Sequence, residues 1–317
     1  MKNDKYKIRT DLAIENSVKA KKMKTEVISG IKVSKIIINE KEGKDIDKKP
    51  GIYYTIDTRA VETHDNDDLE NCENGLASVI KSIMKAEKIT KNKKGLVVGL
   101  GNINVTPDSL GPLVVDNVIV TRHLFLLNPK KVSEGVSEIS AIAPGVMGTT
   151  GIETYDIIDA LLKKIKIDYM IVVDALASRA IERVNKTIQV TNTGIKPGSG
   201  VGNKRKEISK ETMGIPVIAI GVPTVVDAVT ITSDTIDLIV NYFEKVTNED
   251  VAKEFLGSIG ILSEENKRKL IDEILTPTGF NMMVTPKEVD LDISDLTQVI
   301  SRAIDKAVHP IITQSEV

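Results

Sequence analysis

The chain alternates short apolar segments with amphipathic stretches, and this alternation limits the folds open to it. Segments that are apolar on both faces occur at 95–100, 139–143, 168–173, 187–190 and 215–222. Helical spacing fills several of the gaps between them, at 109–127, 153–165, 176–184 and 224–246. Strands that are apolar on both faces and alternate with helices are typical of a parallel sheet with helices on its faces. The sequence therefore predicts an α/β fold with a mostly parallel sheet flanked by helices.

The N-terminal part of the chain differs from this pattern. Residues 1–30 are polar and rich in lysine, which indicates a mobile leader or a loosely docked arm. Residues 31–38 and 52–56 predict two further strands, the first of them at an edge of the sheet. Helical spacing of apolar residues predicts a helix over 67–89.

The C-terminal part, residues 248–317, is helical in pattern. Pro277-Thr278-Gly279 marks a break in it, and 294–308 predicts a last amphipathic helix. We expect this part to pack onto the main domain as a helical extension, so that one α/β domain accounts for the chain.

The charge balance excludes some partners. The chain has 43 basic and 45 acidic residues, a net charge of −2, which argues against nucleic acid or a membrane surface as the main partner. We find no apolar run of membrane-spanning length and no apolar signal region at the N-terminus. A single cysteine, Cys72, fits a reducing cytoplasm.

Two aspartates follow buried strands of the predicted sheet. Asp108 lies in the loop after the strand at 95–100, and Asp174 comes directly after the strand at 168–173. Ligands of open α/β sheets bind beyond the carboxyl ends of the strands, and a carboxylate contributes nothing to an apolar core. Two carboxyl groups close together share a proton, which gives one acid and one base for attack by water on a peptide carbonyl. The alternative is that each aspartate only caps a turn or a helix.

Other candidate sites are weaker. The motifs His-Glu-x-x-His and Cys-x-x-Cys are absent, and the three histidines are far apart in sequence, so we expect neither a metal nor another cofactor. The segment 197–206 is rich in glycine and basic residues, but its spacing is wrong for a phosphate-binding P-loop. Its amides and cations, Lys204 and Arg205 among them, are candidates for orienting a substrate carboxylate or an oxyanion. A solvated basic loop is the alternative.

Several long stretches together resemble the germination proteases of spore-forming bacteria. They include Val105-Thr106-Pro107-Asp108-Ser109-Leu110-Gly111-Pro112, Asp174-Ala175-Leu176-Ala177-Ser178-Arg179, Pro197 to Ser209 and Ile218 to Ala228. The resemblance implies an atypical aspartic-type endopeptidase whose essential aspartates are Asp108 and Asp174. It also implies a fold similar to the hydrogenase-maturation peptidases, and small acid-soluble spore proteins as substrates in the cytoplasm of the spore core.

The same resemblance implies a homotetramer that is made as a zymogen and removes its own leader. Thr10-Asp11-Leu12-Ala13 resembles the family's cleavage site, which places the cut between Asp11 and Leu12. Residues 1–11 would then be a propeptide and 12–317 the peptidase domain. The region 245–262 is shorter than in the family members known to us.

Two alternative functions stay open at this point. The first is a metal-dependent peptidase in which Asp108 and Asp174 are ligands, as comparable carboxylates are in the hydrogenase-maturation peptidases. The second is a non-enzymatic sensor whose glycine-rich loops bind a nucleotide or a phosphate metabolite.

Overall fold

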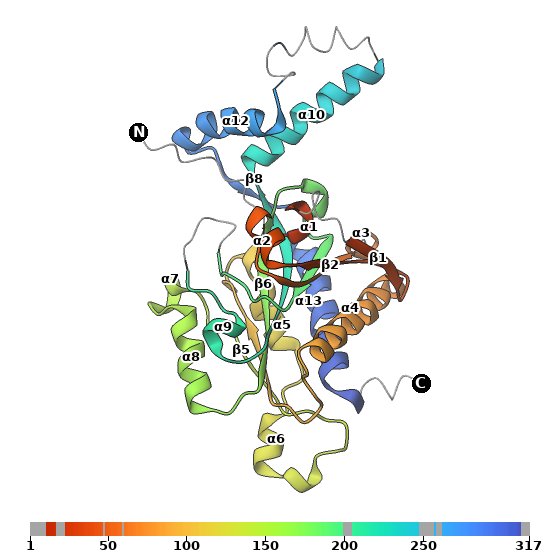
Figure 1. Cartoon of the computed structure of the whole chain (residues 1–317), viewed down its shortest axis with the longest axis vertical. Coiled ribbons are helices and arrows are strands. Elements are labelled where there is room, and N and C mark those ends of the chain that lie inside the picture. Colours follow the sequence, from red (N-terminus) through yellow and green to blue (C-terminus); the bar gives the residue numbers. More distant parts are fainter. Residues whose placement is uncertain are drawn as a thin grey trace.

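A computed structural model of the chain describes residues 11–16, 23–46, 48–58, 60–198, 205–246, 257 and 262–311. Its centre is one sheet with the strand order β1-β2-β3-β7-β8-β6-β4-β5, and β9 pairs with β8 (Figure 1). The strands are β1 (Met23–Ile28), β2 (Ile31–Ile38), β3 (Gly51–Asp57), β4 (Gly95–Gly99), β5 (Ile139–Ile142), β6 (Tyr169–Ser178), β7 (Thr187–Thr191), β8 (Val217–Asp227) and β9 (Met283–Val284).

The sheet is mixed, and its helix-covered α/β architecture confirms the predicted fold class. The neighbours β5, β4, β6 and β8 are parallel to one another, whereas β1, β2, β3, β7 and β8 pair antiparallel in that order. The predicted parallel arrangement therefore holds for β5, β4, β6 and β8, the strands around Asp174. The antiparallel pairing of β1, β2, β3, β7 and β8 was not predicted. It arises because short connections, such as the turn at Ser29-Gly30, allow only antiparallel pairing.

Helices cover both faces of the sheet. They are α1 (Ala13–Asn16), α2 (Glu40–Ile46), α3 (Ala60–Thr63), α4 (Asn66–Ala86), α5 (Leu110–Asn117), α6 (Arg122–Leu127), α7 (Met147–Thr150), α8 (Thr154–Lys164), α9 (Lys210–Met213), α10 (Ala228–Val246), α12 (Glu264–Thr278) and α13 (Val289–Val308). Short 3-10 turns are η2 (Thr106–Asp108), η3 (Pro129–Lys131) and η4 (Ile181–Arg183). The helices expected at 67–89 and 153–165 are confirmed as α4 and α8, and the last helix begins earlier than expected.

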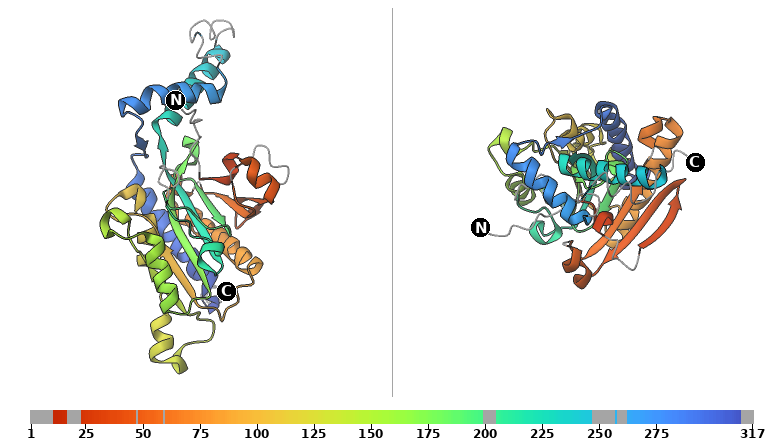
Figure 2. Two further views of the ribbon diagram at one scale, coloured as in Figure 1. Left: turned by 60° about the vertical axis from the view of Figure 1, so that its left-hand side comes forward. Right: turned by 90° about the horizontal axis from the view of Figure 1, so that it is seen from above.

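Three apolar clusters join these layers. The largest lies between the sheet and α4, α5 and α13, with Leu76 and Leu296 fully buried in it. A second cluster packs α8, through Ile158, on the opposite face of β4 and β6. A third lies beside β2 and β3, where the N-terminal residue Ala13 contacts Ile36 and its neighbours. Figure 2 shows the sheet between these helical layers.

The described residues of the N-terminal segment, 11–16 and 23–30, take part in the fold more than the sequence indicated. Residues 23–28, expected to belong to a leader, form β1, which makes β1 and not 31–38 the edge of the sheet. Residues 13–16 form α1, whose Ala13 is fully buried. The expectation of a loosely docked arm is therefore wrong for these residues, because β1 gains a ladder of hydrogen bonds with β2 that its polar composition does not reveal.

Some predicted helices also differ. The helix expected at 176–184 is wrong, because β6 continues to Ser178 in register with Val226 of β8. Contrary to the expectation from the sequence, the stretch Leu110–Leu127 is long and apolar enough to cross a membrane by length and composition. The structure divides it into α5 and α6, helices of 8 and 6 residues, each much shorter than the roughly 20 residues that a span needs.

The described residues of the C-terminal part are mostly helical, as predicted, but the expected packing onto the main domain holds for α13, whereas α12 packs mainly on α10. The helices α10 and α12 extend beyond the end of β8 and away from the sheet (Figures 1 and 2). Buried Arg268 of α12 donates to Asp234 of α10 at 2.8 Å and to Thr230 at 3.1 Å, which ties the two helices together. The chain then returns through β9 to α13, which packs on α4 and α5.

Candidate active site

Asp174 lies on β6 where the neighbouring strand β4 ends. The last pair of the β4–β6 ladder joins Gly99 to Val173, and Leu100 donates one more hydrogen bond to the Val173 carbonyl at 2.8 Å before the chain turns away. Asp174 is only 5% exposed and lies within β6, not at its end as the sequence predicted. The edge of β6 that follows Val173 is thus left open on the β4 side.

Asp108 comes back to this open edge on the loop that follows β4. Its Oδ2 accepts a hydrogen bond from the Asn102 amide at 2.8 Å, and its carbonyl accepts from the same amide at 3.0 Å. Gly101 has a φ of +115°, and a Cβ on it would lie 2.0 Å from the Asp108 carbonyl oxygen. The loop therefore closes tightly enough that only glycine fits opposite Asp108.

A bulge in β8 holds the other side of this loop. The register between β6 and β8 shifts after Leu176, so that Ala177 pairs with Val225 and Thr224 is left over. The Thr224 hydroxyl donates to the Pro107 carbonyl at 2.6 Å. Bulges re-aim side chains next to active sites, and here the displaced threonine fixes the turn that carries Asp108.

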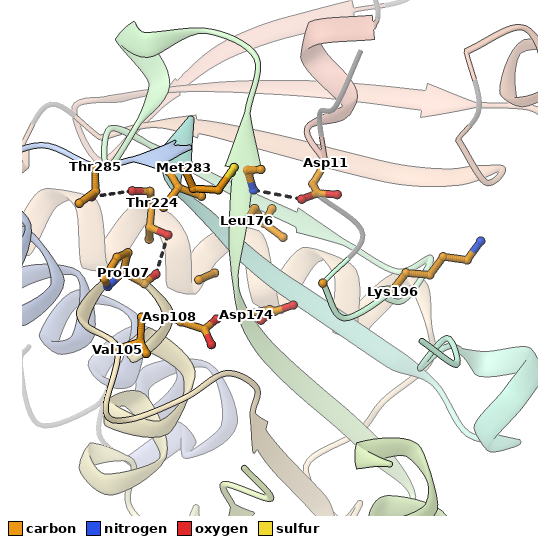
Figure 3. Close-up of a pocket in the computed structure, with 14 residues that line it drawn as sticks. Asp11, Val105, Pro107, Asp108, Asp174, Leu176, Lys196, Thr224, Met283 and Thr285 are labelled. Carbon is orange, nitrogen blue, oxygen red and sulfur yellow. Dashed lines mark hydrogen bonds between the residues drawn. The ribbon is translucent and has the colours of Figure 1, made fainter. Parts of the chain in front are cut away.

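The two aspartates line one cavity of about 400 Å³ together with Asp11 (Figure 3). Most of the remaining wall is apolar, and Lys196 also lines it, with its ammonium group pointing away from Asp108 and Asp174 (Figure 3). The other lining residues are Val105, Pro107, Ala175, Leu176, Ala177, Gly198, Thr224, Val225, Met283 and Thr285. A mainly apolar pocket with a few polar groups is the usual form of a ligand-binding site.

The protonation of the pair is unequal. Burial, followed by the negative charges of Asp108 and then of Asp11, raises the pKa of Asp174 well above its usual range. Burial also raises the pKa of Asp108, but the Asn102 amide and the positive charge of Arg205 oppose that rise. The arrangement favours a proton on Asp174 and a negative charge on Asp108, which is the division an acid–base pair requires.

The other predicted site residues are placed as follows. Arg205 is near enough for its charge to lower the pKa of both Asp108 and Asp174. Lys204 lies outside the described residues. Asp11 lines the cavity, and Leu12 beside it is fully buried.

The segment that contains Asp11 and Leu12 lies along β6. The Asp11 amide donates to the Ala177 carbonyl at 3.2 Å, and the Ala177 amide donates to Asp11 Oδ2 at 3.0 Å. Four residues on, the Glu15 carboxylate accepts from the Ser178 hydroxyl at 2.8 Å and from the Arg179 amide at 3.0 Å. Since β8 covers the other edge of β6, the segment uses the edge that β4 leaves open.

Two residues at this segment were not predicted. The Lys48 Nζ donates to the Asp11 carbonyl at 2.9 Å, and the Gln189 side chain contacts both Asp11 and Ala13. Nothing in the sequence distinguishes Lys48 from the other lysines. Gln189 could have been found from the sequence, because an amide side chain inside a fully buried strand needs hydrogen-bond partners.

A metal ion fits this site poorly. Among the described residues, no group of three or more His, Cys, Asp or Glu side chains is placed to hold an ion. Asp11 lines the same cavity, but it does not form with Asp108 and Asp174 a group of three that could hold an ion, whereas catalytic zinc sites use three protein ligands. We therefore derive no step through a metal.

In comparison with known proteins, the family model and the curated relatives agree. The family model for germination protease matches residues 2–252 and 244–317. The germination protease of Bacillus cereus (strain AH187) is 47% identical over 351 residues, covering 98% of this chain and 96% of that protein. The germination protease of Geobacillus sp. (strain WCH70) is 47% identical over 355 residues, covering 98% of this chain and 95% of that protein. Among solved structures, the [NiFe] hydrogenase maturation protease HycI from Thermococcus kodakarensis matches with 16% identity and a TM-score of 0.29, covering 46% of this chain and 80% of that chain.

Proposed function

This chain belongs to the germination protease family, and from that premise we propose that it is an endopeptidase that begins the degradation of small acid-soluble spore proteins in the spore core. Family membership itself assigns a peptidase role in germination. The observation that supports the finer proposal is the placement of two carboxyl groups, Asp108 and Asp174, in the wall of one cavity.

In the proposed reaction, Asp108 acts as the base and Asp174 as the acid. The Asp108 carboxylate takes a proton from water while the water oxygen bonds to the carbonyl carbon of the substrate. Asp174 then gives its proton to the amide nitrogen as the C–N bond breaks. The proton that Asp108 took from water passes to Asp174, which restores the starting protonation of both residues. Because coupled carboxyl groups titrate together, the pH profile of cleavage reports the pair and not one residue.

We further propose that the chain is made as a zymogen and cuts itself between Asp11 and Leu12. Asp11 lines the same cavity as Asp108 and Asp174, which supports this bond as an internal substrate. Residues 1–10 of the proposed propeptide lie outside the described residues. Sequencing the N-terminus of the matured protein tests the cut, since a new start other than Leu12 contradicts it.

The proposed homotetramer has candidate contact surfaces. Leu126 and Leu127 of α6 are 65% and 81% exposed, and Leu238 and Tyr242 of α10 are 68% and 63% exposed. Apolar side chains exposed on these two helices are candidates for such contacts, because contiguous exposed apolar surface marks protein–protein interaction sites. Light scattering on the purified chain measures the assembly, and a monomeric mass would contradict the tetramer.

The decisive experiment replaces each aspartate by the isosteric amide. We expect Asp108→Asn and Asp174→Asn each to reduce cleavage of a spore-protein substrate by at least about 100-fold, because positioned acid–base groups contribute roughly 10²–10⁴-fold. Asp168→Asn is the matched control, since Asp168 directly precedes β6 at its opposite end and pairs with Lys93. Full activity of either active-site variant would refute the acid–base proposal.

The same assay separates the remaining alternatives. Loss of activity with a chelator, together with stoichiometric metal in the protein, would support a metal-dependent peptidase instead. A large thermal shift with nucleotides and no peptide cleavage would support the phosphate-binding sensor. Family membership argues against that sensor.

A further inference from the structure

Gln189 places a primary amide inside a strand that is buried throughout. All of β7 is buried, and Gln189 itself is 7% exposed. Burying an amide without partners is costly, so its contacts are informative. Its Oε1 accepts from the Ala13 amide at 2.6 Å, and its Nε2 donates to the Asp11 carbonyl at 3.3 Å. One side chain therefore binds the backbone on both sides of Leu12.

Lys48 approaches the same carbonyl oxygen from another element. Its Nζ donates to the Asp11 carbonyl at 2.9 Å, from the connection between α2 and β3. Its backbone is anchored, since the Lys48 amide donates to the Gly43 carbonyl at 3.0 Å. A neutral amide and a cation thus converge on one peptide oxygen, and a hydrogen bond from a cation is about twice as strong as one between neutral groups.

This oxygen belongs to the peptide bond between Asp11 and Leu12. The residue before the bond, Asp11, lines the cavity of Asp108 and Asp174 (Figure 3). The residue after it, Leu12, is fully buried. The acid–base pair comes from β6 and η2, whereas the two donors come from β7 and the α2–β3 connection, so the donors belong to other elements than the pair.

We propose that Lys48 and Gln189 bind the carbonyl oxygen of the bond that is cut and stabilise the negative charge that forms on it. When the water oxygen bonds to the carbonyl carbon, the π electron pair moves to the carbonyl oxygen, where both donors point. This electron pair forms the C=O bond again as the C–N bond breaks and the amide nitrogen takes the proton of Asp174. Donors already placed around a developing oxyanion stabilise the transition state more than the ground state.

This proposal rests on the proposed self-cleavage, and its test uses the full-length chain. We expect Lys48→Met to slow the first-order formation of the Leu12 N-terminus, followed by mass spectrometry, by about 10²–10³-fold, the usual loss of an oxyanion donor. Lys48→Arg keeps a cation and restores much of the rate. Lys49→Met is the control, because the neighbouring lysine pairs with Glu207 and Glu211 and its change leaves the rate unaltered.

Gln189→Glu gives a second, independent readout. Glutamate keeps an acceptor for the Ala13 amide but replaces the donor with an oxygen that repels the carbonyl once it is ionised. We expect the rate relative to the unmodified chain to fall as the pH rises, which loss of packing alone would not produce. Melting temperatures of all variants identify any that fail to fold. If Lys48→Met is one of them, the cleavage rates of Lys48→Arg and Gln189→Glu test the proposal.

The outcomes separate the two proposals. If Lys48→Met cuts itself as fast as the unmodified chain while Asp174→Asn does not, the role of Lys48 is wrong and the acid–base pair remains. Equal slowing by Lys48→Met and Lys49→Met also overturns it. If the unmodified chain never cuts between Asp11 and Leu12, the proposed self-cleavage itself fails.

Discussion

Gly101 controls the position of Asp108, and replacing it tests that control. Its φ of +115° lies in a region that residues with a side chain rarely adopt. In Gly101→Ala, the new Cβ would lie 2.0 Å from the Asp108 carbonyl oxygen and 3.2 Å from its Oδ1. The nearer contact is with backbone, which cannot swing aside as the end of a flexible side chain can, so Asp108 has to move.

The size of the effect follows from that movement. A strained backbone conformation costs roughly 1–3 kcal/mol, which a domain of this size survives. Catalysis is more sensitive, because a shift of about 1 Å in a catalytic group costs on the order of 100-fold in rate. We therefore expect Gly101→Ala to remain folded, with a modestly lower melting temperature, and to cleave at about one hundredth of the normal rate.

Gly148→Ala is the matched control. Gly148 lies in α7, and a Cβ there meets nothing within 4 Å. Alanine in a helix is favoured over glycine by roughly 0.5–1 kcal/mol, so this variant should be as stable as the unmodified chain or slightly more so, with normal cleavage. Both variants are compared by thermal melting and by the rate of self-cleavage. Normal cleavage by Gly101→Ala would show that the loop does not fix Asp108 as we infer.

Two further changes test other parts of the structure. Burial raises the pKa of Asp305 to about 6, so this carboxyl stabilises the fold below its unfolded pKa and loses that contribution as the pH rises through about 6. Asp305→Asn, which keeps an acceptor for the Ile119 amide, should therefore unfold like the unmodified chain near pH 4 and be more stable at pH 8 by up to roughly 3 kcal/mol in urea titrations. A difference that does not change with pH would contradict this. Ala13→Leu overfills a fully buried position, at a cost of about 1–3 kcal/mol, and should slow self-cleavage roughly 5- to 150-fold. An unchanged rate would mean that this segment is not bound in this way when it is cut.

The fold was largely predictable where the signal is local. Apolar runs identified β4, β5 and β7 closely, and helical spacing identified α4 and α8. The error at 176–184 has a physical cause: Ala175-Leu176-Ala177 is apolar in a way that fits helix and strand equally. Pairing with β8, a partner distant in sequence, decided in favour of a strand.

For the candidate site, the amino-acid sequence by itself identified Asp108 and Asp174 as candidates, from their positions after buried strands and from the family resemblance. Only the tertiary structure brought Asp11, Lys48 and Gln189 to the same place. The hydrogen bond from Gln189 to Asp11 joins residues 178 positions apart, and no local pattern encodes such a pair. The arrangement of the strands brings these residues together. β6 extends past the end of its neighbour β4, and the N-terminal segment binds at the open edge that results.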